Sequence, residues 1–147
     1  MATDIVKKVR EFNRFYTSII GITNNHILQS EYSLTEVRVM FETYNNPGIT
    51  ARQLMKIIRV DEGYLSRLIA KLVKQKILSK KRSKEDNRNY SLELSSSGKK
   101  IFLRLDERSS YAVSQLVSHL TKVEQSQLIQ LLDGVRTLLT KKIEDEN

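Results

Sequence analysis

The stretch from Thr50 to Leu94 constrains the fold of this chain more than any other segment. It contains two short helical runs, Thr50 to Arg59 and Asp61 to Gln75, joined by a tight turn. From about Ile77 the apolar spacing changes from helical to alternating, which indicates a short hairpin rich in Lys and Arg. Many unrelated proteins could contain a helix pair followed by a basic hairpin, so the flanking segments are needed to assign the parts of this stretch.

Helical patterns flank this stretch on both sides. Residues Asp4 to about Gln29 repeat apolar side chains in steps of three and four, as one face of a long helix requires: Ile5, Val9, Phe12, Tyr16, Ile19, Thr23 and Ile27. The runs that follow Ser95 and Thr121 carry similar stripes, with Leu and Val at successive turns. A small domain cannot cover so much apolar surface, so we expect these helices to pack against a second chain.

Short polar motifs mark where the helices begin. In a capping box, a Ser or Thr side chain accepts from the backbone N–H three residues on, and a Glu or Gln side chain reaches back. Three segments match it: Ser33-Leu-Thr-Glu36, Thr50-Ala-Arg-Gln53 and Thr121-Lys-Val-Glu124. Asp61 suits the N-cap of the second central helix. The predicted order is α-α-α-α-β-β-α-α with a very short strand at Ile49, which is a mainly α fold with a small β-hairpin.

The chain has 147 residues, the size of one domain with a real core. No run approaches eighteen uncharged apolar residues, and the N-terminal MATDIVKKVREF lacks the apolar centre of a secretory signal. We therefore expect a cytoplasmic protein without a membrane span. The absence of cysteine excludes disulfides, cysteine nucleophiles and the usual structural zinc sites. His26 and His119 lack metal-ligand spacing, so neither a metal nor another cofactor is predicted.

The positive charge of the chain lies almost entirely in its middle. The formal net charge is +8. Residues Thr50 to Arg104 hold 15 Lys and Arg against 5 Asp and Glu, whereas the remaining residues hold 10 against 12. A basic segment in an otherwise balanced chain is what binding to a phosphate backbone requires. A solvated basic face is the alternative, but here the charge falls on elements that can dock on DNA.

The second helix of the central pair is expected to read double-stranded DNA. An α-helix fits the major groove of B-DNA, and side chains at its N-terminal end meet the base edges. The candidate contacts on it are Glu62, Gly63, Tyr64, Ser66, Arg67 and Lys71. Among them, Arg67 can bind guanine through two hydrogen bonds. For Lys71, contact with phosphate and simple solvation fit the sequence equally well.

The hairpin and the first central helix supply further candidate contacts. An Arg at a hairpin tip can enter a minor groove, where the negative potential is enhanced. The hairpin candidates are Arg82, Lys84, Asp86, Arg88 and Asn89. Asp86 can orient Arg88 through an ion pair, supply turn chemistry, or do both. Thr50 and Arg52 are the candidates at the start of the first helix.

The segment from Ser33 to Gly98 resembles the MarR family of winged helix-turn-helix transcription regulators. The matching pieces are SLTEVRVMFETYNNPGITARQLMKIIRV, DEGYLSRLIAKLVKQKIL and EDNRNYSLELSSSG, and the pattern of the last piece is met by Asp86, Arg88, Leu92, Leu94 and Gly98. Two positions depart from the family. Lys76 stands where Gly often ends the recognition helix, so the helix must end without the residue that adopts positive φ most easily, and Ser95 stands where Thr is common.

A finer likeness lies near the N-terminus. VREFNRFYTSIIG, together with YSLTEVRVMFE and DEGYLSRLIAKL, is similar to the MarR-like half of regulators fused to a GNAT-type acetyltransferase. The chain stops at Asn147, too soon for that second domain, so the resemblance implies either a stand-alone version or the first half of such a fusion.

The MarR resemblance implies one domain that forms a homodimer. Residues 1–32 and 99–147 would be the dimerisation helices, and residues 33–98 the winged helix-turn-helix lobe. Two such lobes would bind an inverted-repeat operator, with half-sites about one helical turn, roughly 34–36 Å, apart. Small-molecule effectors of this family commonly bind between the dimerisation helices and the lobe, where Arg14, Tyr16 and His26 are the candidates.

Three functions are compatible with these patterns. The first is a sequence-specific transcription regulator, a repressor that a ligand releases or retunes. The second is an architectural protein that coats DNA with little sequence preference and would bind operator and random duplex alike. The third is an enzyme, suggested only by the likeness to acetyltransferase fusions. The sequence has no phosphate-cradling Gly-rich loop and no nucleophile beside a base, so we expect no enzymatic activity.

Overall fold

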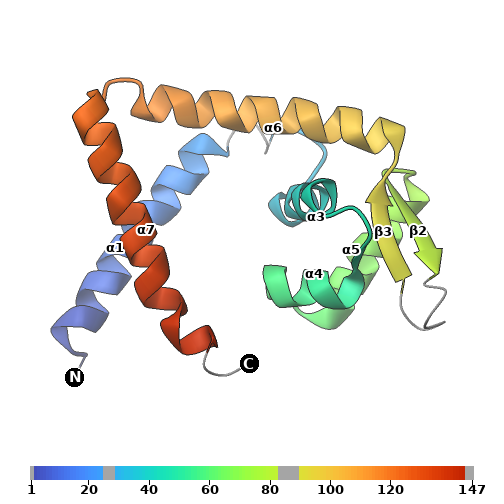
Figure 1. Ribbon diagram of the computed structural model, residues 1–147, viewed down its shortest axis with the longest axis horizontal. Coiled ribbons are helices and arrows are strands. Elements are labelled where there is room, and N and C mark those ends of the chain that lie inside the picture. The colour runs from blue at the N-terminus through green and yellow to red at the C-terminus, as the bar shows by residue number, and fades with distance from the viewer. Residues whose placement is uncertain (1, 25–28, 83–89, 145–147) are drawn as a thin grey trace. The chain divides into compact units, whose positions relative to one another are not determined.

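The computed structural model describes residues 2–24, 29–82 and 90–144, which contain six helices and three strands (Figure 1). The helices are α1 (Asp4–Thr23), α3 (Leu34–Asn45), α4 (Ala51–Ile58), α5 (Glu62–Lys74), α6 (Ser96–Val117) and α7 (Lys122–Glu144), and the strands are β1 (Ile49–Thr50), β2 (Leu78–Arg82) and β3 (Tyr90–Leu94). The mainly α fold with a small β-hairpin is therefore confirmed. The chain divides into two compact units, Met1–Ala112 and Val113–Asn147.

The three strands form one antiparallel sheet in the order β1-β3-β2. In the hairpin, Leu78 pairs with Leu94 and Arg82 pairs with Tyr90, while Ile49 of β1 pairs with Leu92. The sequence-based pairing of these two strands and the very short strand at Ile49 are both confirmed. The hairpin tip, residues 83–89, lies outside the described residues.

The core of the first unit is built by side chains of the sheet and of the helices α3, α4, α5 and α6. Figure 1 shows α5 beside the strands, while α6 runs away from the end of β3. Phe102 of α6 contacts the rings of Phe41 and Tyr44, with ring centroids 6.2 and 4.9 Å apart. The apolar stripe predicted for α5 is buried here, but of the residues predicted for the inner face of α4 only Leu54 is buried, while Ile58 is half-buried and Ile57 is 41% exposed. The buried set is Val39, Met40, Ile49, Leu54, Leu65, Leu68, Ile69, Leu72, Ile77, Leu78, Leu92, Leu94, Phe102 and Leu105.

Two of the three predicted capping boxes are complete. Thr50 and Gln53 cap each other at the start of α4, with hydrogen bonds of 3.0 and 3.2 Å. Thr121 and Glu124 do the same before α7, at 3.1 Å in both directions.

The third capping box is only half made. The Ser33 hydroxyl accepts from the N–H of Glu36, but the Glu36 carboxylate bonds Lys71 instead of reaching back. The capping-box prediction was therefore wrong for that side chain, because an ion pair with another helix outweighs the local bond.

The end of α1 also differs from the sequence-based prediction, whereas α5 ends within one residue of the predicted Gln75. α1 ends at Thr23 rather than near Gln29, and its C-cap Asn24 takes a non-helical conformation. α5 ends in a two-bond Schellman motif: the Lys76 N–H bonds the Val73 carbonyl, and the Ile77 N–H bonds that of Leu72. Lys76 occupies the left-handed position itself, with φ 60°.

The start of α6 lies against the end of α5. The Ser95 hydroxyl accepts from the N–H of Gly98 at 2.9 Å and donates to the Lys76 and Ile77 carbonyls. A methyl group at Gly98 would overlap the carbonyl oxygen of Ile77, so only glycine fits there without moving the backbone. This joint attaches α6 directly to the end of the predicted DNA-reading helix.

Helices α1 and α7 leave most of their apolar residues exposed. On α1, Ile5 is 69% exposed and Phe15 58%. On α7, Leu131 and Leu138 are each 68% exposed. No helix in the described part of the chain is long and apolar enough to cross a membrane.

Candidate nucleic-acid interface

The turn between α4 and α5 is built by two residues with special backbone or capping roles. Arg59 ends α4 in the left-handed conformation, with φ 57° and ψ 45°. Asp61 then caps α5, since its carboxylate accepts from the N–H of Tyr64 at 3.0 Å, as predicted. The turn therefore fixes the start of α5 relative to α4.

Helix α5 is buried on one side and exposed on the other. Leu65, Leu68, Ile69 and Leu72 lie in the core, whereas the predicted DNA contacts are all exposed: Glu62, Gly63, Tyr64, Ser66, Arg67 and Lys71. A methyl group at Gly63 would lie 3.2 Å from Asp61 Oδ2 and 3.4 Å from Arg67 Nη1. The Arg67 guanidinium therefore lies over the first turn of α5, where a base edge would approach.

The hairpin presents a cationic face close to α5. Lys80 Nζ lies 3.9 Å from the centroid of the Tyr90 ring, and the Arg82 guanidinium carbon lies 5.9 Å from it. Lys81, on the other face of β2, lies 3.9 Å from a carboxylate oxygen of Glu93. Lys80 and Arg82 thus stand together on one face of the strand, and Tyr90 supports both through cation–π contacts.

A groove of about 480 Å³ runs between α5 and this hairpin face. Its walls carry the two lysines Lys74 and Lys80, and Tyr90 and Leu92 contribute apolar surface. Such a groove combines positive charge with an apolar wall, which suits a sugar–phosphate segment.

The remaining candidates are placed as follows. Thr50 is half-buried and its hydroxyl is used in the cap of α4, while Arg52 is exposed beside it. Lys84, Asp86, Arg88 and Asn89 lie outside the described residues, and their contact with DNA stays a prediction.

Lys71 has a partner that the sequence did not indicate. Its ammonium group donates to Glu36 Oε1 of α3 at 2.9 Å, and this hydrogen bond raises the pKa of Lys71. Glu36 and Lys71 are 35 positions apart, so no local pattern reports the pair. Lys80 and Tyr90 were also missed as interacting residues, although the alternating hairpin register carries that signal.

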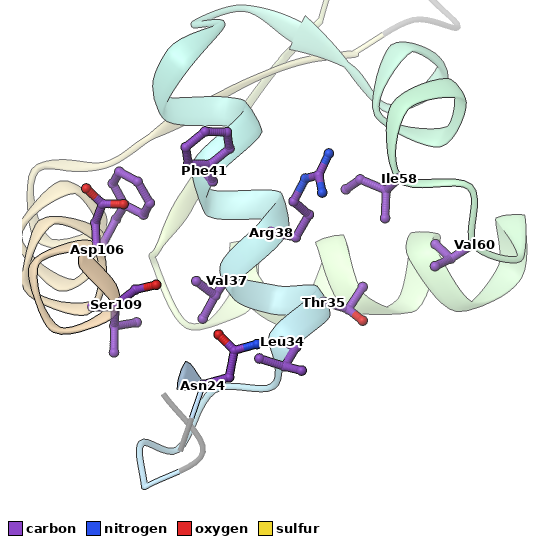
Figure 2. Close-up of a pocket in the computed structure, with 12 residues that line it drawn as sticks. Asn24, Leu34, Thr35, Val37, Arg38, Phe41, Ile58, Val60, Asp106 and Ser109 are labelled. Atoms are coloured by element: carbon purple, nitrogen blue, oxygen red, sulfur yellow. The ribbon is translucent and has the colours of Figure 1, made fainter. Parts of the chain in front are cut away.

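An open pocket of about 540 Å³ lies along α3, and none of its lining residues belongs to α5. Figure 2 shows Asp106 and Ser109 of α6 on one side of α3 and Ile58 and Val60 on the other. The predicted effector residues Arg14 and Tyr16 are not among the residues that line it, and His26 lies outside the described residues. The lining residues are Asn24, Leu34, Thr35, Val37, Arg38, Phe41, Ile58, Val60, Phe102, Leu105, Asp106 and Ser109.

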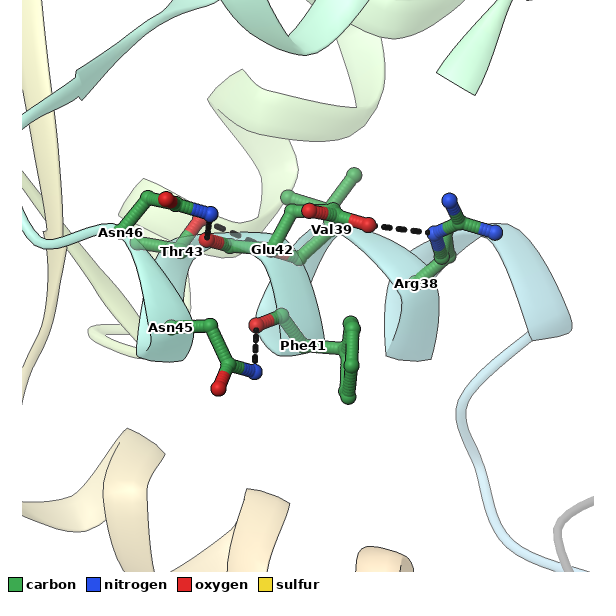
Figure 3. Close-up of polar contacts among 7 residues, drawn as sticks. All are labelled: Arg38, Val39, Phe41, Glu42, Thr43, Asn45 and Asn46. Atoms are coloured by element: carbon green, nitrogen blue, oxygen red, sulfur yellow. Dashed lines mark hydrogen bonds and ion pairs between the residues drawn. The ribbon is translucent and has the colours of Figure 1, made fainter. Parts of the chain in front are cut away.

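Arg38 is the cation of this pocket, and its orientation is fixed from within α3. Its Nε donates to Glu42 Oε1 at 2.9 Å (Figure 3). Figure 3 also shows Asn46 donating to the Glu42 carbonyl and Thr43 to that of Val39, which secure the C-terminal half of the same helix.

The chain is similar to known transcriptional regulators. A family model described as "Transcriptional regulator SarA/Rot" matches residues 24–105. The HTH-type transcriptional regulator BilQ of Clostridium symbiosum is 31% identical over 86 residues. That match spans 58% of this chain and 60% of the length of BilQ.

Two solved structures share the fold. A mutant MarR from E. coli, in complex with operator DNA, has a TM-score of 0.75 and 21% identity, covering 90% of this chain and 95% of that one. PcaV from Streptomyces coelicolor, in complex with its natural ligand, has a TM-score of 0.73 and 20% identity, covering 92% of this chain and 97% of that one. At these identities the likeness establishes the fold, a MarR-like winged helix.

Proposed function

The chain belongs to the SarA/Rot family of transcriptional regulators, and from that premise we propose that it binds an inverted-repeat operator as a homodimer. In this proposal α5 enters the major groove, and the β2–β3 hairpin contacts the neighbouring backbone. The observation that carries it is the division of α5 into a buried apolar side and an exposed polar side headed by Ser66 and Arg67.

Charge and placement support the same orientation. Lys80 and Arg82 stand on one hairpin face, and Lys74 lines the groove between that face and α5. A DNA backbone lying in this groove would bring the base edges to the N-terminal end of α5. The operator-bound MarR is a protein of the same fold that binds DNA, which agrees with this use of the lobe.

The proposed homodimer rests on α1 and α7. Their apolar side chains, Ile5, Phe15, Leu131 and Leu138 among them, are exposed to solvent in the single chain. Large exposed apolar patches mark interaction sites in soluble proteins. A two-fold dimer would cover them and would place two copies of α5 on one face of the DNA.

We further propose that the protein is a repressor whose DNA affinity a small molecule lowers. The pocket around α3 supports this step, because it combines an apolar wall, Val37 and Phe41, with the charged groups Arg38 and Asp106. PcaV, a protein of the same fold, is known in complex with its natural ligand, which agrees with a ligand-binding role for such a fold. A ligand that favours a dimer with the wrong spacing of the two α5 helices would release the operator.

The decisive experiment is selection of bound duplexes from a random pool with the purified chain, followed by affinity measurements on the selected sequence. Arg67→Ala is expected to relax base preference at one position of each half-site and to weaken binding about tenfold or more. Arg82→Ala is expected to weaken binding to selected and random duplexes equally. Arg108→Ala, an exposed arginine on α6, is the matched control and should change neither.

Equal affinity of the wild-type chain for selected and random duplexes at the same salt concentration would favour the architectural alternative. Unchanged affinity and selectivity in both Arg67→Ala and Arg82→Ala would remove α5 and the hairpin from the interface.

A further inference from the structure

Glu36 is a charged residue buried in the first turn of α3. Only 7% of its side chain is exposed. Its Oε1 accepts from Lys71 Nζ at 2.9 Å, and its Oε2 is buried without a hydrogen-bond partner among the residues that the structure describes. A buried carboxylate is unfavourable unless a cation or several donors compensate it. Among those residues, Lys71 is the compensating cation for Glu36.

Lys71 stands on the DNA-reading helix, one turn beyond Arg67. Its side chain is 51% exposed, and the spacing of four residues places it beside Arg67 on the same face of α5. An unpaired lysine at this position would be free to contact a phosphate. Here its ammonium group is directed toward Glu36 of α3.

We propose that Glu36 is a positioning residue for DNA recognition, which holds Lys71 as a tether between α3 and α5 and keeps this cation off the phosphate backbone. The inference rests on the proposed use of α5 in DNA binding. It assigns a role to Glu36, which makes no contact with DNA itself.

The physical reason is that Lys71 stabilises more by pairing with Glu36 than it would by contacting a DNA phosphate. If its ammonium group turned to a phosphate, Glu36 Oε1 would lose its hydrogen bond, and neither oxygen of the buried carboxylate would have a partner among the described residues. Lys71 would gain only one solvent-exposed contact with a phosphate, and salt weakens such a contact. The ion pair therefore persists in the complex, and the incomplete capping box at Ser33 is the local consequence of this use of Glu36.

The count of phosphate contacts tests the proposal, because each one contributes about 0.9 to the slope of log K against log salt concentration. We would measure this slope for the full chain on its selected duplex. The variants are Glu36→Gln, the neutral pair Glu36→Gln with Lys71→Met, and Lys74→Met. Lys74 is exposed on the same helix and serves as the control for a true phosphate contact. Thermal melts would show that each variant folds.

The expected slopes differ between the variants. Glu36→Gln frees Lys71 and should make the slope steeper by about 0.9, with higher affinity for random duplex. The neutral pair should keep the wild-type slope, since Lys71 contributes no contact in the wild type. Lys74→Met should make the slope shallower by about 0.9.

Two outcomes would contradict the proposal that Glu36 holds Lys71 away from the phosphate backbone. A shallower slope in the neutral pair would show that Lys71 contacts phosphate in the wild-type complex. An unchanged slope in Glu36→Gln would show that Glu36 does not restrain Lys71. Failure of the proposed function looks different: the wild-type chain would then bind duplex DNA weakly or without preference, and Lys74→Met would leave the slope unchanged.

Discussion

The helix-turn-helix lobe and the pair α1 and α7 use the same kind of apolar residue in opposite ways. Leu72 of α5 is fully buried, whereas Leu138 of α7 is 68% exposed. Both leucines belong to helical apolar stripes in the sequence. The lobe completes its core within one chain, while α1 and α7 carry apolar surface that the described residues do not cover. Stability of the lobe and association of the chain should therefore respond to different mutations.

The largest expected effect is in the lobe core. Leu72→Ala removes a fully buried side chain from well-packed surroundings and should lower the free energy of unfolding by about 3 kcal/mol. Leu103→Ala on α6, where the leucine is 48% exposed, is the matched control and should cost less than about 1 kcal/mol. Urea titrations at fixed protein concentration would measure both. Equal losses in the two variants would contradict the division into a buried lobe and an exposed remainder.

The next effect concerns association. Leu138→Ser should weaken the proposed homodimer on the order of a hundredfold, because a two-fold interface loses the side chain twice, about 1.5 kcal/mol each time. Sedimentation over a range of concentrations would measure the dissociation constant. Gln130→Ser, an exposed polar position on the same helix, should leave it unchanged. A dimer that tolerates Leu138→Ser would place the contact away from this part of α7.

The smallest effect is a gain in stability at the end of α5. Lys76 holds a left-handed conformation that costs an L-residue energy and a glycine almost none. Lys76→Gly should therefore raise the free energy of unfolding by about 1 kcal/mol. Lys76→Ala removes the charge but keeps Cβ, and should give no such gain. If both variants stabilised the fold equally, the relief would come from the charge and not from the backbone.

The elements of the lobe were predictable because their signals are local. Periodicity located α4 and α5, alternation located the hairpin, and the motifs at Thr50 and Thr121 marked helix starts correctly. The Glu36 error has a physical reason: a side chain chooses between a local bond and a distant partner, and only the local one is visible in sequence. Likewise, periodicity predicts that a face of α7 is apolar but does not say what covers it.

The candidate site was predictable in its residue types and less so in its connections. Arg67, Ser66 and Tyr64 are exposed on α5 as expected. The spacing of the apolar residues alone predicts that these three side chains lie on a helix. The contacts between Lys80 and Tyr90 required the strand register, and the Lys71 ion pair required the packing of α3 on α5. The pocket around α3 was missed because its lining residues come from segments far apart in sequence.

The joint at Gly98 has a mechanical consequence for such a regulator. The Ile77 carbonyl oxygen occupies the place where a Cβ on Gly98 would lie, and the Ser95 hydroxyl donates to the carbonyls of Lys76 and Ile77, so the first turn of α6 packs directly on the end of α5. The first turn of α6 and the end of α5 are therefore expected to move together. A rotation of α6 would then move α5 as well and, in the proposed complex, change how α5 fits the operator.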